Sequence, residues 1–134
     1  MKLFLSYRFT GEDPEELEKT LGAIKTALEA EGHSVYCSFW SERLFREGSF
    51  TNGQIIEHAF SEIDKTDGVF ALVKSADKSE GMLLEIGYAL AEGKKLFLAV
   101  KKGVATVFVR EEADKVLEFE NIDDLLNKVK TAVL

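Results

Sequence analysis

The chain has few of the residues that build disulfide-stabilised, metal-binding or membrane-spanning proteins. Cys37 is the only cysteine among 134 residues, so no internal disulfide can form, and we expect a reducing compartment, the cytoplasm. The two histidines, His33 and His58, have no cysteine or carboxylate cluster at metal-ligand spacing, and we expect neither a metal nor a cofactor. No apolar run approaches the length of a membrane span, so we expect no membrane partner.

Positive charge is also scarce. The 17 Lys and Arg residues are outnumbered by 24 Asp and Glu residues, which gives a formal net charge of −7. Nucleic acids and anionic membranes would repel such a chain, so we expect neither as a partner, although a helix N-terminus can still supply a local anion site. The length and the 46% hydrophobic content are typical of one soluble domain, which we expect to cover residues 1–134.

Apolar strand patterns alternate with amphipathic helix patterns along the whole chain. Pro14 after Asp13 marks a helix start, and Gly32 marks its end. The patterns predict strands at 3–7, 35–39, 68–74, 95–100 and 116–119, and helices at 14–31, 53–65, 80–92 and 122–133. We expect residues 40–52 to form a long loop, and residues 104–113 fit either a strand or a helix. This alternation predicts a parallel sheet that is covered on both faces, with right-handed crossovers.

The candidate chemistry lies after the third predicted strand. Residues 68–73 are an uninterrupted apolar run, and Ser79 can cap the helix that follows. Gly81, in the first turn of that helix, leaves room for a ligand close to the backbone. A strand, a short polar loop and a helix start form the usual ligand crevice at the carboxyl edge of a parallel sheet. Glu85 lies one and a half turns into the helix and could reach such a crevice.

The periodicity of this helix gives a simpler alternative for Glu85. On a helical wheel Glu85 lies away from Leu83, Ile86 and Leu90, the predicted core side. An acidic residue opposite a core stripe is usually part of the solvated surface. A catalytic role requires that Glu85 face the crevice instead.

Several motifs together resemble the nucleoside 2-deoxyribosyltransferase superfamily. Residues 85–89, Glu-Ile-Gly-Tyr-Ala, are followed by Gly93-Lys94 and an apolar strand; residues 66–73 are similar to that family's aspartate-led third strand, and residues 3–8 to its opening strand and substrate loop. The resemblance covers most of the chain and is most specific over residues 67–95. It implies a three-layer, flavodoxin-like α/β fold with a five-stranded parallel sheet in the order 2-1-3-4-5.

The resemblance also implies a reaction. In this family the glutamate that matches Glu85 attacks the anomeric carbon of a nucleoside, and the glycosyl-enzyme ester passes to water or to another base. Asp67 would orient Glu85 or the departing base, or would simply be a loop residue before a strand. The partner is then a small nucleotide or nucleoside. Related enzymes imply at least a homodimer in which a partner chain closes the active site, with Met82, Leu83, Tyr88 and Leu90 partly in the interface.

Ser79 distinguishes the branches of the superfamily. The transferases carry an acidic residue six positions before the nucleophile, whereas the 2'-deoxynucleoside 5'-monophosphate N-hydrolases resemble this chain in carrying a serine. An aspartate at a helix N-terminus would repel a phosphate that a serine can bind; an ordinary helix cap is the alternative. The resemblance implies that Arg8, Thr10 and Gly11 complete the phosphate site, and that Tyr7 lines the sugar pocket or is a buried strand-end residue.

Two other interpretations stay open. Residues 4–8 with residues 11–13 also resemble the first box of TIR domains, which are signalling adaptors or cleave the glycosidic bond of NAD. Their glutamate normally lies near a tryptophan–cysteine pair, which residues 82–84 lack. A non-catalytic nucleotide-binding module on the same fold is the third interpretation. The sequence therefore predicts an N-hydrolase of nucleoside 5'-monophosphates, with a base-exchanging transferase as the nearest alternative.

Overall fold

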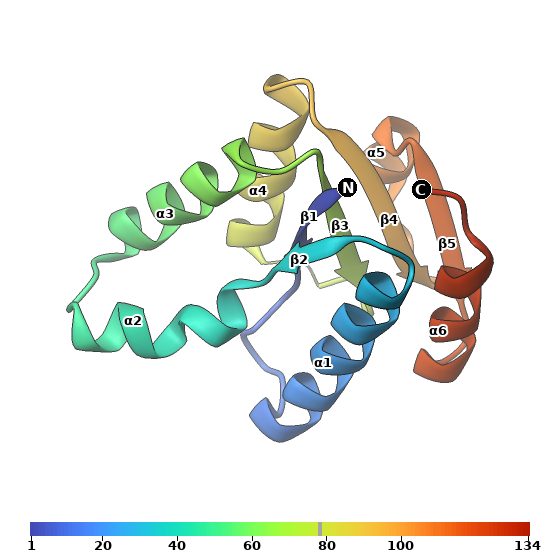
Figure 1. The fold of residues 1–134 in the computed structure, drawn as a ribbon, viewed down its shortest axis with the longest axis horizontal. Helices are drawn as coiled ribbons and strands as arrows, with labels where there is room; N and C mark the ends of the chain where they lie inside the picture. Colours follow the sequence, from blue (N-terminus) through green and yellow to red (C-terminus); the bar gives the residue numbers. More distant parts are fainter. Residues whose placement is uncertain (78) are drawn as a thin grey trace.

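The protein, seen in a computed structural model that describes residues 1–77 and 79–134, is a sheet between two layers of helices (Figure 1). The described strands are all parallel and lie in the order β2-β1-β3-β4-β5. They are β1 (Lys2–Ser6), β2 (Ser34–Tyr36), β3 (Gly68–Val73), β4 (Lys95–Lys101) and β5 (Lys115–Phe119). The predicted flavodoxin-like fold with a five-stranded parallel sheet in the order 2-1-3-4-5 is confirmed.

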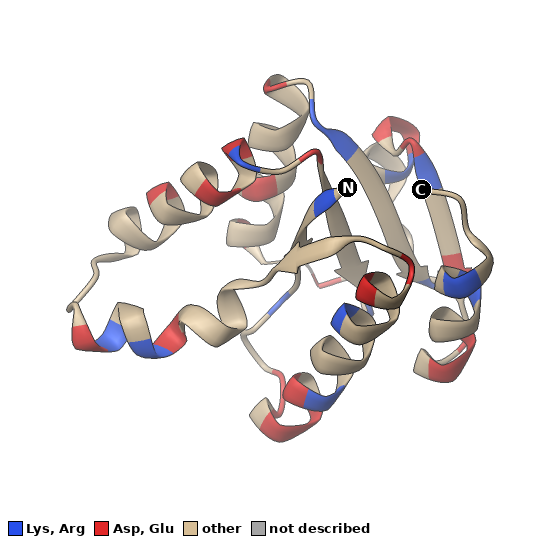
Figure 2. Ribbon diagram, viewed as in Figure 1, with Lys and Arg blue, Asp and Glu red and all other residues tan. Residues whose placement is uncertain are grey.

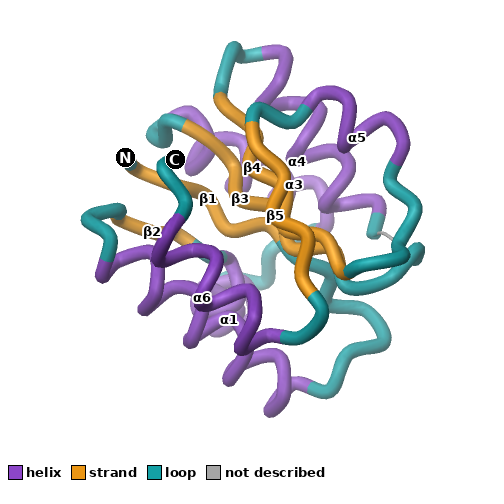
Figure 3. Tube along the Cα trace, turned by 90° about the vertical axis from the view of Figure 1, so that its right-hand side faces the viewer, coloured by secondary structure: helices purple, strands orange, loops and turns teal. Residues whose placement is uncertain are grey.

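Helices cover both faces of the sheet (Figure 3). One face carries α1 (Pro14–Ala30) and α6 (Ile122–Thr131), and the other carries α3 (Asn52–Asp64), α4 (Glu80–Ala91) and α5 (Val107–Glu112). Alternate residues of each strand point to opposite faces, so the strands contribute to two separate cores. Leu3 and Phe70 pack in the core beneath α1 and α6, while Phe4 and Val69 pack in the core beneath α3 and α4.

The helix starts agree with the predicted boundaries. Pro14 occupies the first turn of α1, and Asp13 is its N-cap residue, although the Asp13 side chain makes no capping hydrogen bond. Thr51 and Gln54 form a reciprocal capping box at α3, which satisfies two backbone N–H groups at once. These local signals fix where the chain leaves each strand and turns back across the sheet.

Two segments differ from the predicted pattern, and a third, which fitted either a strand or a helix, is now assigned. The second strand ends at Tyr36, because only Lys2–Phe4 of β1 pair with it. The predicted loop 40–52 is wrong in part: a 3-10 helix, η1 (Ser38–Ser41), and α2 (Glu42–Glu47) occupy most of it. Residues 104–113 contain the helix α5, since β4 and β5 already pair directly and this segment is their crossover.

Charged side chains lie on the helices and at the strand ends, while the middle of the sheet carries none (Figure 2). All six residues of β3 are buried, as expected for a central strand covered on both faces. Within the described part of the chain, no helix combines the length and the apolar character that crossing a membrane requires.

Candidate active site

The site lies where the strand order reverses. The chain leaves β1 toward β2 on one side, and β3 pairs with β1 on the other. The region beyond the carboxyl ends of β1 and β3 is where sheets of this kind bind their ligands, and we refer to it as the switch-point crevice. Ser6, the last residue of β1, is opposite Ala71 of β3 and is only 1% exposed. Ser6 is the only polar residue among the four buried residues of β1.

Glu85 of α4 faces this crevice. The Ser6 hydroxyl donates a hydrogen bond of 2.7 Å to Glu85 Oε1. The face of α4 that packs on the sheet carries Met82, Ile86 and Ala89, all buried, and Glu85 lies beside that face rather than opposite it. The surface interpretation of Glu85 is therefore wrong, because the buried face of α4 is shifted toward Glu85 from the predicted one: Ile86 is buried as predicted, but Leu83 is 44% exposed.

The surroundings of Glu85 favour its neutral form. Burial raises the pKa of the Glu85 carboxyl from 4.5 to about 7, and the hydrogen bond from Ser6 lowers this pKa and so offsets part of the effect. A carboxylate that is poorly solvated at neutral pH has a free-energy reason to form a covalent bond or to accept a proton. Glu85 is therefore suited to nucleophilic or acid–base chemistry.

Two further groups of the crevice stay neutral. The Tyr7 ring is half-buried and packs edge-on against Phe39, with ring centroids 6.2 Å apart. Burial raises the pKa of the Tyr7 hydroxyl, and the nearby charge of Glu85 adds to the rise. Cys37 is buried, and the same two causes help to raise the pKa of its thiol to about 12. Neither side chain is a charged partner for Glu85, and Cys37 is not a reactive thiolate.

The loop after β1 crosses over to the loop after β3. Arg8 Nη1 donates to Ser75 Oγ at 3.3 Å. Gly11 has a φ of +81°, and a Cβ there would lie 3.0 Å from Arg8 Nη2, so glycine lets the guanidinium fold over the backbone. Thr10 is exposed beside them. Arg8 and Gly11 are thus brought together at the carboxyl edge, and Thr10 lies at the rim.

A small cavity lies under these loops. Its volume is about 10 Å³, and Tyr7, Arg8, Glu12, Lys74 and Met82 are among its lining residues. Met82 is one helical turn before Glu85 on α4, so the cavity adjoins the crevice of the carboxylate. Lys74 pairs with Glu12 across it at 3.1 Å.

Ser79 is the N-cap residue of α4. Its hydroxyl oxygen accepts a hydrogen bond of 3.1 Å from the Met82 amide, so the capping alternative is present. Because the hydroxyl acts here as an acceptor, its proton can still be donated to a ligand. Gly81 is half-buried, and a Cβ there would meet no atom within 4 Å; the first turn of α4 is open to a ligand.

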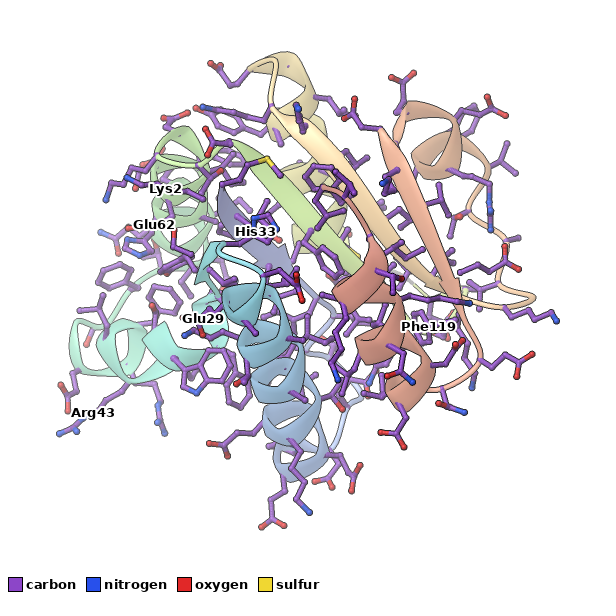
Figure 4. The ribbon with its side chains drawn as sticks, turned by 45° about the vertical axis from the view of Figure 1, so that its right-hand side comes forward. Lys2, Glu29, His33, Arg43, Glu62 and Phe119 are labelled. Carbon is purple, nitrogen blue, oxygen red and sulfur yellow. The ribbon has the colours of Figure 1, made fainter. Side chains whose placement is uncertain are left out.

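Asp67 does not join this group. It precedes β3 at the amino edge of the sheet, where its carboxylate accepts a 2.8 Å hydrogen bond from the Lys2 amide. Lys2, labelled in Figure 4, lies at the start of β1, four residues along the strand from Ser6. An orienting role toward Glu85 or a leaving base does not fit this position, because Glu85 faces the opposite, carboxyl edge.

Sequence reasoning missed Ser6, Glu12, Lys74 and Ser75. A serine at the end of an otherwise apolar strand was the available signal for Ser6, since a buried hydroxyl requires a partner. Lys74 and Ser75 directly follow β3 and belong by position to the crevice loops. Their pairing with Glu12 and Arg8 joins residues more than 60 positions apart in the chain, which no local pattern reveals.

Two other features lie apart from the small cavity under the loops. A groove of about 510 Å³ runs between α1 and β2, and Glu29, labelled in Figure 4, lines it together with Cys37 and Trp40. Arg43 lies on α2, far from the sheet. Over residues 1–77 and 79–134, no group of three or more His, Cys, Asp or Glu side chains is arranged to hold a metal ion.

The fold and the site together define a class of protein: a flavodoxin-like domain with a half-buried carboxylate at the switch point of its sheet. The sequence matches the family "Nucleoside 2-deoxyribosyltransferase" over residues 7–125. The chain belongs to this family, and it is an enzyme of the N-glycosidase or deoxyribosyltransferase type. Family membership favours this resemblance over the TIR one.

Solved structures with the same fold include two of related type. The CMP N-glycosidase BcmB of Clostridium botulinum is 19% identical, with a TM-score of 0.72 over 98% of this chain and 100% of that one. The 2-deoxyribosyltransferase of Bacillus psychrosaccharolyticus is also 19% identical, with a TM-score of 0.64 over 95% and 91% of the two chains. A conserved protein from Enterococcus faecalis V583 is 14% identical, with a TM-score of 0.67 over 99% of each. The sequence matches none of the curated proteins.

Proposed function

We propose that the protein hydrolyses the N-glycosidic bond of a nucleoside 5'-monophosphate, a 2'-deoxynucleotide in particular, through a covalent intermediate on Glu85. The observation that carries the proposal is the Glu85 carboxylate itself. It faces the switch-point crevice, it is held by Ser6 at 2.7 Å, and burial raises its pKa to about 7. Family membership supplies the class of reaction, and this carboxylate is the group suited to perform it.

The reaction would proceed in two displacements at one carbon. An oxygen of Glu85 attacks the anomeric carbon, the C–N bond breaks, and the base leaves with the electron pair and takes up a proton from solvent. Water then attacks the same carbon, which releases the sugar phosphate and regenerates the carboxylate, with retention of configuration overall. Ser6 would keep the attacking oxygen in place and partly balance the cost of its charge.

Ser79 supports the monophosphate as substrate. A serine at the N-terminus of α4 adds no negative charge where the phosphate would lie, whereas the acidic residue of the transferases would repel it. The Ser79 hydroxyl accepts from Met82 and keeps its own proton to donate to a phosphate oxygen. Arg8 adds a positive charge to the same edge of the sheet.

Incubation with a panel of nucleosides and nucleotides tests the proposal, with and without an acceptor base. Free base plus sugar phosphate from a monophosphate is the expected result. Base exchange without hydrolysis would identify a transferase, nicotinamide release from NAD a TIR-like enzyme, and no reaction at all a binding module. Glu85→Gln should lower turnover by several orders of magnitude with little change in substrate binding; normal turnover would refute the nucleophile.

A second variant tests the phosphate contact. Ser79→Asp introduces repulsion at the helix N-terminus and should raise KM for monophosphates while nucleosides are spared. An equal rise in KM for nucleosides and monophosphates would mean that Ser79 only caps α4. The matched control is Ser61→Asp, because Ser61 is exposed on α3 and the substitution adds the same charge away from the start of α4.

We also propose that the protein forms at least a homodimer. Met82 is buried in the core and cannot contribute to an interface, but Leu83 and Leu84 of α4 and Phe108 of α5 are between 44% and 85% exposed. Apolar side chains exposed on one helix layer favour association. Light scattering should give a mass of at least twice 15.0 kDa; the mass of a single chain at working concentration would refute the proposal.

A further inference from the structure

Two loops at the carboxyl edge are tied together by two polar contacts. The first loop, residues 7–13, follows β1, and the second, of which residues 74–77 are described, follows β3. Arg8 donates to Ser75 across the gap at 3.3 Å, and Lys74 pairs with Glu12 at 3.1 Å. All four residues of these contacts line the cavity under the loops.

The cavity has no room for a phosphate group. Its volume of about 10 Å³ is roughly that needed for a single water molecule, and a phosphate is larger. A phosphate that occupies this cavity must therefore separate the two loops.

The formal charges of the residues that line the cavity add up to zero. Its lining contains two cations, Arg8 and Lys74, and two carboxylates, Glu12 and Asp77. The Lys74 and Glu12 side chains are 29% and 23% exposed, so their attraction is less screened than that of an open surface pair. The ammonium group of Lys74 is therefore already paired with an anionic group of the protein, the Glu12 carboxylate.

We propose that Glu12 is an internal competitor for the substrate phosphate. In the free protein its carboxylate occupies Lys74, and an incoming monophosphate displaces it, which opens the two loops and gives the phosphate both Lys74 and Arg8. The inference rests on the proposed function for the identity of the substrate. It adds Lys74 as the residue that binds the phosphate and Glu12 as the residue that sets the strength of this binding.

Titration calorimetry with inorganic phosphate tests this without any turnover. Glu12→Gln keeps the size of the side chain and removes its charge, so phosphate should bind on the order of tenfold more tightly than to the wild type. Lys74→Gln should bind phosphate more weakly than the wild type. Glu118→Gln, which removes one carboxylate from an exposed pair on β5, should leave phosphate binding unchanged and so controls for net charge.

Unchanged or weaker phosphate binding by Glu12→Gln would overturn the proposal, as would an equal gain in Glu118→Gln or no detectable binding by any variant. Glu12→Ala is the second variant, and circular dichroism checks that both are folded. The proposed function can fail separately. If the wild type cleaves no nucleotide but the variants bind phosphate as predicted, the anion site stands and the substrate of the enzyme is a different one.

Discussion

Replacing Glu85 by Gln should stabilise the protein at neutral pH while it abolishes turnover. The carboxyl group has a pKa of 4.5 in its ordinary state and of about 7 in the folded protein. This difference is equivalent to about 3 kcal/mol at ~1.36 kcal/mol per pH unit. Glu85 is partly exposed, so solvent reduces the figure, and we expect a gain of about 1–3 kcal/mol in unfolding free energy. The Gln amide oxygen can still accept the hydrogen bond from Ser6.

The pH dependence of the gain has a defined sign. Because the folded-state pKa of Glu85 is raised, the folded protein binds more protons than the unfolded chain between pH 4.5 and about 7. The wild type therefore loses stability as pH rises through this window, and the loss is complete above it. The Gln variant has no such group, so its advantage should be near zero at about pH 4 and largest at about pH 8.

Urea unfolding of both proteins, followed by circular dichroism at a series of pH values, measures this difference. Glu118→Gln is the control, because a change in an exposed pair should alter stability by no more than ~0.5 kcal/mol. A Gln variant that is less stable than the wild type at about pH 8, or whose advantage does not vary between about pH 4 and pH 8, would refute the reasoning. The carboxylate would then be solvated, as the helical wheel indicated.

Three other substitutions test the remaining geometry. Ser6→Ala removes the hydrogen bond that lowers the pKa of Glu85, so the acidic limb of the pH–rate profile should move to higher pH; an unmoved limb would separate Ser6 from the reaction. Asp67→Asn, at the amino edge of the sheet, should leave kcat/KM within about twofold of the wild type, and a loss of two orders of magnitude in steady-state assays would return Asp67 to the site. Gly11→Ala adds a side chain at a φ of +81° and 3.0 Å from Arg8 Nη2, so urea unfolding should show a loss of about 1–3 kcal/mol; an unchanged midpoint would mean that the loop relaxes freely.

The alternation of patterns was enough to predict most of the fold. Continuous apolar runs such as residues 68–73, in a chain that alternates strand and helix patterns, indicated central parallel strands. Pro14 and Ser79 marked helix starts that the structure confirms. The segments that differed carry mixed signals. Aromatic residues such as Phe39 and Phe45 are compatible with a strand, a loop or a helix, and their tertiary contacts decide which one forms.

For the site, the sequence determined that a carboxylate lies one and a half turns into the helix after the central strand, in a chain with the motifs of one family. Only the tertiary structure decided which way it faces. Between residues 81 and 91 Glu85 is the one charged residue, so helical periodicity offers no polar face by which to orient α4. Packing of Met82 and Ala89 on the sheet turns Glu85 toward Ser6. The same docking separates it from Asp67, because a parallel sheet sends the two ends of β3 to opposite edges of the domain.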